Sequence, residues 1–258
     1  MSLSRNKDYL ATIFCPLYKG EKFIEGYMED MISQSVFSRV KFYILDCNSP
    51  ENEYETIERY LGYENILYER LGEDPGLYEA WNICCKRAGT DLVGNWNVDD
   101  RKSPWSLEAL IQPFLLDQDL DISYGATFIS EKANERWEEV QKTLIFPCRE
   151  TNNWKDLIFN NFPHCMPVWK KSIHDRFGYF DSSYETAADS DMWIRAVKAG
   201  AKIKMVSDIV GIYYKNPNGR STDKETFKQM IDEVNTMRRK HYPEYNTSNE
   251  NRISISSN

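Results

Sequence analysis

The chain of 258 residues lacks the segments that mark a membrane-spanning or secreted protein. No apolar run comes near the roughly 20 residues that cross a bilayer. The polar N-terminus, residues 1–8, has no apolar centre of the kind found in signal peptides. We therefore expect a cytoplasmic protein without a transmembrane segment, for which any membrane contact would be peripheral.

Patterns typical of zinc proteins and of nucleic-acid binders are also missing. The six cysteines form no C-x-x-C pair and there are only three histidines, so buried, reduced thiols are expected in place of a zinc site. The formal net charge of -8 argues against a general nucleic-acid binder, because such proteins need a basic surface for phosphates. A local basic pocket remains compatible with this charge.

Neither an internal repeat nor a Gly/Ser/Pro-rich linker divides the chain, and its length suits one large domain. Apolar strands are expected at 9–14, 40–45, 66–69 and 92–96, the first stopped by Pro16, with helices at 21–36, 54–61, 77–88 and from 103 onward. Strands that alternate with helices predict an α/β fold with a Rossmann-like, mostly parallel central sheet flanked by helices.

The second half is less regular. Strands are expected at 122–129, 201–206 and 209–214, helices at 152–162 and 187–199, and an exposed polar segment at 131–140. The end of the chain, residues 243–258, is rich in Asn and Ser and is expected to be disordered.

Polar clusters follow three of the expected strands. They are Leu17-Tyr18-Lys19, Asp46-Cys47-Asn48 and Asn97-Val98-Asp99-Asp100. Ligands bind at the carboxyl ends of strands in open α/β sheets, so these clusters are candidates for one site. Asn97 and Asp99 would face the same way in an extended segment, where their oxygens suit a hard divalent cation. The alternative is that the clusters are ordinary turns, which favour Asp and Asn.

Five motifs then occur in an order that resembles family 2 glycosyltransferases of the capsule and lipopolysaccharide type, which have the GT-A fold. The motifs are Cys15-Pro16-Leu17-Tyr18-Lys19; Ser33-Gln34-Ser35 with Tyr43-Ile44-Leu45-Asp46-Cys47-Asn48-Ser49; Asp74-Pro75-Gly76-Leu77-Tyr78-Glu79-Ala80-Trp81-Asn82; Asn97-Val98-Asp99-Asp100; and Ala187-Ala188-Asp189-Ser190-Asp191-Met192-Trp193-Ile194-Arg195. The resemblance implies a GT-A domain over 1–222, with a nucleotide-binding half at 9–102 and an acceptor half at 103–222, followed by a C-terminal helix at 223–242.

The resemblance also implies roles for individual residues. Asp46 would hold the nucleobase, Asp74 the ribose or base, and Asp99 the Mn or Mg ion that bridges the two phosphates. The complete set of implied donor-binding residues is Pro16, Tyr18, Asp46, Asn48, Asp74, Gly76, Tyr78, Asn82, Asn97 and Asp100. Asn97 is neutral where many members have Asp, which would weaken the affinity for metal.

Asp189 would be the general base that takes the proton of the acceptor hydroxyl. Ala188 replaces the Glu that often precedes the base, so Asp191 is the alternative base. Both carboxylates could instead cap the helix N-terminus, where anions are favoured.

Several further side chains have two interpretations. His164 and Trp193 resemble acceptor-site residues but could be structural, Trp154 and Trp169 could stack on sugars or fill the core, and Lys215 and Arg220 could touch the diphosphate or be solvated.

The sequence thus predicts an inverting glycosyltransferase that uses a nucleotide-diphosphate sugar, with UDP favoured, and a divalent metal. A glycan, a lipid-linked sugar or a glycoprotein would be the acceptor. A non-catalytic nucleotide-sugar or glycan-binding module and a sugar nucleotidyltransferase are the alternatives, although residues 17–21 match the glycine-rich signature of the latter poorly. The oligomeric state is left open.

Overall fold

The computed structural model describes residues 9–219 and 224–244. Its strands are β1 (Ala11–Leu17), β2 (Val40–Asp46), β3 (Ile66–Arg70), β4 (Leu92–Asn95), β5 (Arg101–Lys102), β6 (Leu120–Ser130), β7 (Val168–Lys170) and β8 (Lys202–Tyr214). Its helices are α1 (Ile24–Ile32), α2 (Glu53–Ile57), α3 (Leu77–Arg87), α4 (Ser106–Leu116), α5 (Trp154–Phe159), α6 (Ile173–Phe177), α7 (Ala188–Lys198) and α8 (Lys224–His241), with short 3-10 turns at Phe37–Arg39 and Glu58–Tyr60.

The strands form one sheet in the order β3-β2-β1-β4-β7-β6-β8-β5. The strands β3, β2, β1 and β4 are parallel to one another, and β6 is parallel to β8. Strand β7 is antiparallel to both of its neighbours, β4 and β6, and β5 is antiparallel to β8. Leu17 of β1 lies beside Asp46 of β2, which lies beside Arg70 of β3. The polar residues that follow these strands therefore meet at one edge of the sheet.

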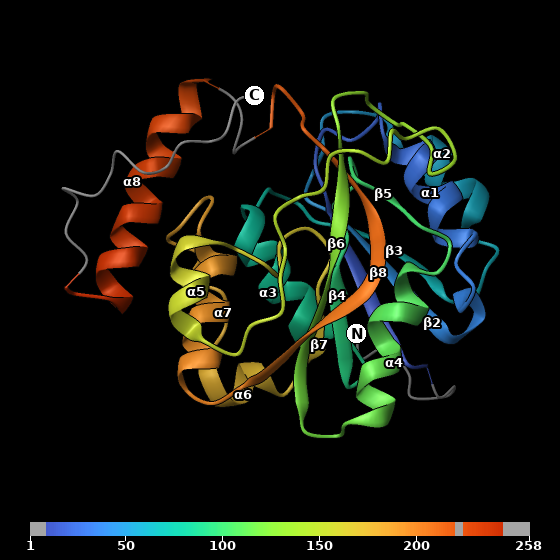
Figure 1. The fold of residues 1–258 in the computed structure, drawn as a ribbon. Coiled ribbons are helices and arrows are strands. Elements are labelled where there is room, and N and C mark those ends of the chain that lie inside the picture. Colours follow the sequence, from blue (N-terminus) through green and yellow to red (C-terminus); the bar gives the residue numbers. More distant parts are fainter. Residues whose placement is uncertain (1–8, 220–223, 245–258) are drawn as a thin grey trace.

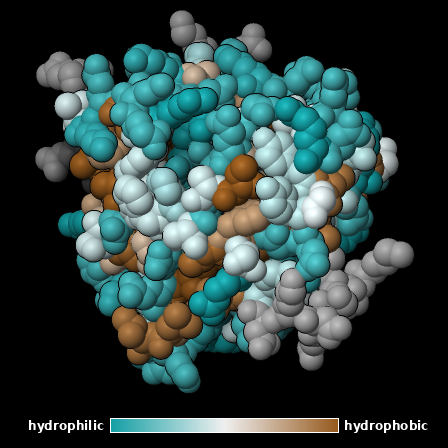
Figure 2. Space-filling view, turned by 90° about the vertical axis from the view of Figure 1, so that its right-hand side faces the viewer, coloured by the Kyte–Doolittle hydropathy of each residue, from teal (hydrophilic) through white to brown (hydrophobic). Residues whose placement is uncertain are grey.

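Helices cover both faces of the sheet, with α1 and α4 on one side and α3, α5 and α7 on the other (Figure 1). Neighbouring residues of one strand serve the two faces: Ile13 belongs to the core under α1 and α4, and Phe14 to the core under α3 and α7. Figure 2 shows that hydrophilic residues predominate on the side where α1, α2 and α4 lie, although hydrophobic patches interrupt them. The last turn of α4 exposes Leu115 and Leu116.

Pro16 does not stop the first strand, which runs on to Leu17. The carbonyl of Phe14 points toward β4 and accepts from the N–H of Trp96. The backbone nitrogen of Pro16, two residues later, points the same way, but β4 has already ended at Asn95. The missing proline N–H therefore costs no ladder bond.

The second half differs from expectation in its connections. Residues 202–214 form one strand, β8, whose register against β6 shifts between Tyr124 and Ala126, where two strands were expected. The short elements β5, β7 and α6 were not expected at all. The exposed polar segment at 131–140 is mixed, because Glu135 and Val140 are buried.

The last helix, α8, lies outside α5 and α7, away from the sheet (Figure 1). Nε of Arg238 donates to the carbonyl of Ile158 in α5, and Nζ of Lys198 in α7 donates to the carbonyl of His241. Of the segment expected to be disordered, 243–258, residues 243 and 244 form a turn and residues 245–258 lie outside the described part of the chain. In the described part of the chain, no helix is both long and apolar enough to cross a membrane.

Candidate active site

Asp46 ends β2 with its carboxylate inside the protein, at 1% exposure. Oδ2 accepts from Nη1 of Arg70 at 2.5 Å and from Oη of Tyr68 at 2.6 Å, while Oδ1 accepts from the N–H of Ser49 at 2.8 Å. Two partners from β3 and one from the turn after β2 thus fix this carboxylate at the sheet edge. Arg70 and Tyr68 were not singled out in the sequence.

Glu53, another buried residue that the sequence analysis missed, joins the loops after β1 and β2. Its Oε1 accepts from the N–H of Gly20 and from Oγ of Ser49, both at 2.7 Å. Oγ of Ser49 in turn accepts from the N–H of Lys19 at 3.0 Å. These bonds hold the 17–20 loop against the 48–53 loop.

The remaining predicted residues of these loops keep some contact with solvent. Pro16 is half-buried, while Asn48 and Tyr18 are exposed, the latter at 40%. Asn48 has a φ of 59°, in the left-handed region that Asn tolerates better than most residues.

Asp74 is exposed, and its Oδ1 accepts from the N–H of Gly76 at 2.8 Å. Gly76 precedes α3 with a φ of 81°, a conformation that glycine adopts without strain. Burial, then the charges of Asp74 and Asp46, raise the pKa of the Cys47 thiol to about 12.

The Asn97–Asp100 turn is built around Lys102, which is 1% exposed. Its Nζ donates to the carbonyls of Asn97 and Asp100 at 2.7 and 2.6 Å. The side chain of Asn95 donates to Oδ1 of Asn97 at 3.0 Å. Burial lowers the pKa of Lys102, and the nearby Asp100 carboxylate opposes this shift.

The adjacent carboxylates Asp99 and Asp100 differ in their surroundings. Asp100 is buried, accepting from the N–H of Tyr214 at 3.0 Å and from Nδ2 of Asn97 at 3.4 Å. Burial, followed by the charge of Asp99, raises the pKa of Asp100 to about 7. Asp99 is half-buried and accepts from Nδ2 of Asn216 at 3.2 Å. Asp100 therefore supports the turn, in place of the donor contact expected of it, and Asp99 remains the outward carboxylate.

The donor atoms around this turn fit a hard divalent ion such as Mn or Mg. Asp99 offers carboxylate oxygens, and Oδ1 of Asn95 is buried without a hydrogen-bond partner. Residues 9–219 and 224–244 contain no group of three or more His, Cys, Asp or Glu side chains arranged as a metal site. A single protein carboxylate nevertheless suffices when phosphate oxygens and water complete the shell.

Asp189 lies at the start of α7 and is half-buried. Oδ1 accepts from Oη of Tyr78 at 3.0 Å and Oδ2 accepts from Nδ2 of Asn161 at 2.7 Å. The two donors come from α3 and from the loop after α5, so distant parts of the chain orient this carboxylate. Asn161 carried no recognisable signal in the sequence.

His164 packs between two aromatic side chains. Its ring stacks on Phe146 at 4.4 Å and meets Tyr213 edge-on at 4.9 Å between centroids. Burial lowers the pKa of His164, and the charge of Asp189 opposes that shift. Tyr214, which follows Tyr213, donates its N–H to Asp100, so His164 packs beside the end of β8 that supports the Asn97–Asp100 turn.

Three further predicted site residues, Asp191, Asn82 and Trp193, make structural contacts. Asp191 is 0% exposed and pairs with Arg195, Lys240 and His241, which hold its pKa far below the usual value against the opposing effect of burial. Asn82 is buried and bonds to both the carbonyl and the N–H of Phe180, at 2.9 and 3.0 Å. Its Nδ2 also donates to Oε2 of Glu79 at 3.2 Å, so both N–H groups of the Asn82 amide are used within the protein.

Trp193 is 1% exposed and packs against Trp169 and Phe180 at 5.3 and 5.7 Å, so it belongs to the core and not to an acceptor surface. Trp169 is a core residue as well. Trp154 is half-buried beneath Nζ of Lys198.

The structure also bears on two cationic side chains and on the six cysteines that the sequence singles out. Lys215 pairs with Glu131 at 3.4 Å on the surface, and Arg220 lies outside the described residues. All six cysteines are free thiols, and all but the half-buried Cys148 are buried.

Comparison with known proteins places the chain in a family. The model of glycosyl transferase family 2 matches residues 12–177. The uncharacterized glycosyltransferase EpsJ of Bacillus subtilis (strain 168) is 25% identical over 240 residues, covering 87% of this chain and 66% of EpsJ.

Solved structures share the fold at low sequence identity. TarS of S. aureus in complex with UDP-GlcNAc has a TM-score of 0.68 at 15% identity, covering 88% of this chain and 66% of that one. The mannosyltransferase PcManGT of Pyrobaculum calidifontis, in complex with GDP-Man and Mn²⁺, has a TM-score of 0.65 at 14% identity, covering 89% and 64%. The chain thus spans slightly less than two thirds of each relative, and the expected GT-A-like fold is confirmed.

Proposed function

Because the chain belongs to glycosyl transferase family 2, a family of sugar-transferring enzymes, we propose that it is an inverting glycosyltransferase that uses a nucleotide-diphosphate sugar. A UDP-sugar is the favoured donor, and a hydroxyl of a glycan, lipid-linked sugar or glycoprotein is the acceptor. The observation that carries the proposal is the half-buried Asp189 carboxylate, which Tyr78 and Asn161 orient by hydrogen bonds. The complexes of TarS with UDP-GlcNAc and of PcManGT with GDP-Man support a nucleotide-sugar donor.

In this proposal the sheet edge binds the donor. Asp46, fixed by Arg70 and Tyr68, accepts hydrogen bonds from the nucleobase, and the exposed Asp74 accepts from the ribose. Pro16, Tyr18 and Asn48 belong to the same loops and would border the base. Asp99, with Asn97 beside it, would hold Mn or Mg against the diphosphate. The ion would neutralise the charge that grows on the departing diphosphate.

Asp189 acts on the acceptor. Its carboxylate takes the proton of the attacking hydroxyl while the hydroxyl oxygen forms a bond to the anomeric carbon. The bond from that carbon to the diphosphate oxygen breaks, and its electron pair leaves with the nucleoside diphosphate. One displacement from the opposite face inverts the anomeric configuration. His164 lies near Asp189 and would border the acceptor.

The test is nucleoside diphosphate release from a panel of UDP-, GDP- and dTDP-sugars with Mn²⁺, measured with mono- and disaccharide acceptors. Asp189→Asn removes the base and should lower kcat by roughly 10²- to 10⁴-fold with little change in donor affinity. The matched control is Asp175→Asn, which replaces an exposed carboxylate on α6 by an amide and should keep full activity. Full turnover by Asp189→Asn would exclude the proposed base.

A non-catalytic nucleotide-sugar-binding module is the second candidate, and the neutral Asn97 beside the buried Asp100 favours it. Such a module would gain thermal stability from a UDP-sugar. It would release no nucleoside diphosphate with any donor, and Asp189→Asn would change nothing.

A further inference from the structure

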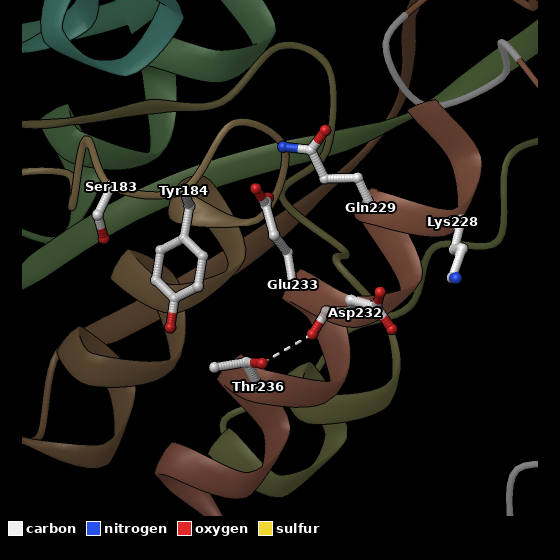
Figure 3. A pocket seen from close by; sticks show the side chains of 7 residues that line it. All are labelled: Ser183, Tyr184, Lys228, Gln229, Asp232, Glu233 and Thr236. Carbon is white, nitrogen blue, oxygen red and sulfur yellow. Dashed lines mark hydrogen bonds between the residues drawn. The ribbon is translucent and has the colours of Figure 1, made fainter. Parts of the chain in front are cut away.

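The helix α8 contacts the chain on both sides of Asp189. On the N-terminal side, the carboxylate of Glu233 accepts three hydrogen bonds from the segment before α7. Oε1 accepts from the N–H of Glu185 at 2.9 Å, and Oε2 accepts from the N–H and the hydroxyl of Thr186, both at 2.8 Å. Figure 3 shows Glu233 projecting from α8 toward the segment that carries Ser183 and Tyr184.

On the C-terminal side, the last turn of α8 holds Asp191. Nζ of Lys240 and Nε2 of His241 approach its Oδ1 at 2.9 and 2.8 Å, and Arg195 of α7 pairs with Oδ2 at 2.7 Å. A fully buried carboxylate needs such partners, because an unpaired charge inside a protein is costly. If α8 moved away from α7, the buried carboxylate of Asp191 would lose two of its three partners.

We propose that these two sets of contacts, the α8 clamp, fix the backbone of residues 185–191 and so position Asp189 for proton transfer. Glu233 bonds to residues four and three positions before Asp189, and Lys240 and His241 bond to the residue two positions after it. The proposal rests on the proposed function of Asp189 as the base. The clamp lies beyond residues 12–177, the part of the chain that matches the family model.

The surroundings of the segment explain why it needs a clamp. Charge-assisted bonds from a carboxylate to backbone N–H groups are among the stronger hydrogen bonds in proteins. Beside them, Ser183, Tyr184 and five residues of α8 border a hollow of about 640 Å³, into which an unrestrained segment could move. Tyr78 and Asn161 hold only the side chain of Asp189, and its backbone lies in the first turn of α7, which the α8 contacts hold on both sides.

Glu233→Gln tests the clamp, because the amide nitrogen cannot accept from an N–H. We expect kcat to fall by roughly 10- to 100-fold, the effect of a small misplacement of a reacting group, with the donor KM changed less than about twofold. Amides of residues 185–191 should exchange with deuterium faster. Asp232→Asn is the matched control, since it removes the neighbouring carboxylate on the same helix. It should leave kcat, KM and amide exchange unchanged.

The combination with Asp189→Asn separates positioning from general stability. If Glu233 acts through Asp189, the double variant should be no slower than Asp189→Asn alone, because effects of residues that act as a unit are not additive. Lys240→Met, which removes a half-exposed cation from the other side of the clamp, should repeat the fall in kcat. Unchanged kcat and unchanged exchange in Glu233→Gln would overturn the clamp, and so would effects that multiply in the double variant. Full activity of Asp189→Asn would instead refute the proposed function, while the exchange measurement would still report on the clamp.

Discussion

Asp189 and Asp191 show how far a sequence distinguishes two candidate bases. Both are acidic residues in the first turn of α7, and the sequence alone allows either of them to be the base or a structural residue. Successive helical residues are about 100° apart, so residues two positions apart face different sides. Asp189 accordingly reaches Tyr78 and Asn161, whereas Asp191 points to α8 and is fully buried. Only the tertiary partners, which local sequence does not encode, assign the roles.

The same limit applies to other site residues. Asp46 and Asp99 stand out in the sequence because Asp after a strand is a recognisable pattern, and Asp74 stands out through its motif, although the roles of all three stay predictions. Lys102 and Glu53 could not, because a buried Lys or Glu resembles a surface residue until its partners are known.

His174 gives a pH-dependent prediction at the residue level. Its Nε2 accepts from Nε1 of Trp169 at 3.0 Å, so it is neutral in the fold, and burial lowers its pKa from 6.5 to about 4. As the pH falls, the unfolded chain takes up the proton on His174 before the folded protein does. The stability that the neutral, buried ring contributes is therefore present above pH 6.5 and is lost as the pH falls through 6.5 toward 4. The loss should reach about 3 kcal/mol by pH 4.

Urea denaturation of the natural protein and of His174→Gln at pH 7.5 and pH 4.5 checks this prediction. The glutamine cannot take up a proton, so the difference in unfolding free energy between the two proteins should shrink at pH 4.5. A difference that stays constant between the two pH values would show that His174 is not buried as a neutral ring.

Among the elements, those with a strong local pattern were predictable. The alternation of apolar strands with helices between β1 and α4 indicated parallel strands, and the structure has them. The two-residue β5, the three-residue β7 and the five-residue α6 are too short to display a period, and tertiary pairing creates them.

The pairing of β5 with β8 gives a prediction at this level. Gly211 lies opposite Lys102, and a Cβ there would stand 2.5 Å from the carbonyl oxygen of Arg101, a backbone atom that cannot turn away. Gly211→Ala should therefore destabilise the protein by roughly 1–3 kcal/mol through overpacking. Gly72→Ala is the control, because nothing lies within 4 Å of its Cβ. Equal midpoints of urea denaturation for both variants would contradict the close approach of the two strands.

At the level of the whole molecule, the mostly parallel sheet brings the ends of β1, β2 and β4 to one edge, as the order of the motifs predicted. The position of α7 relative to that edge depends on β6, β7 and β8, whose mixed directions the sequence did not reveal. The division into a nucleotide-binding half and an acceptor half stays a prediction. The central claim is that Asp46, Asp99 and Asp189 border one donor site although they are far apart in the chain.

A crystal structure of the protein with an unreactive UDP-sugar analogue and Mn²⁺ tests this claim most directly. We predict uracil beside Asp46, Mn²⁺ bound by Asp99 and the diphosphate, and the anomeric carbon facing Asp189 across the space left for the acceptor. A nucleotide bound away from the ends of β1, β2 and β4, or a sugar whose anomeric carbon faces away from Asp189, would contradict it.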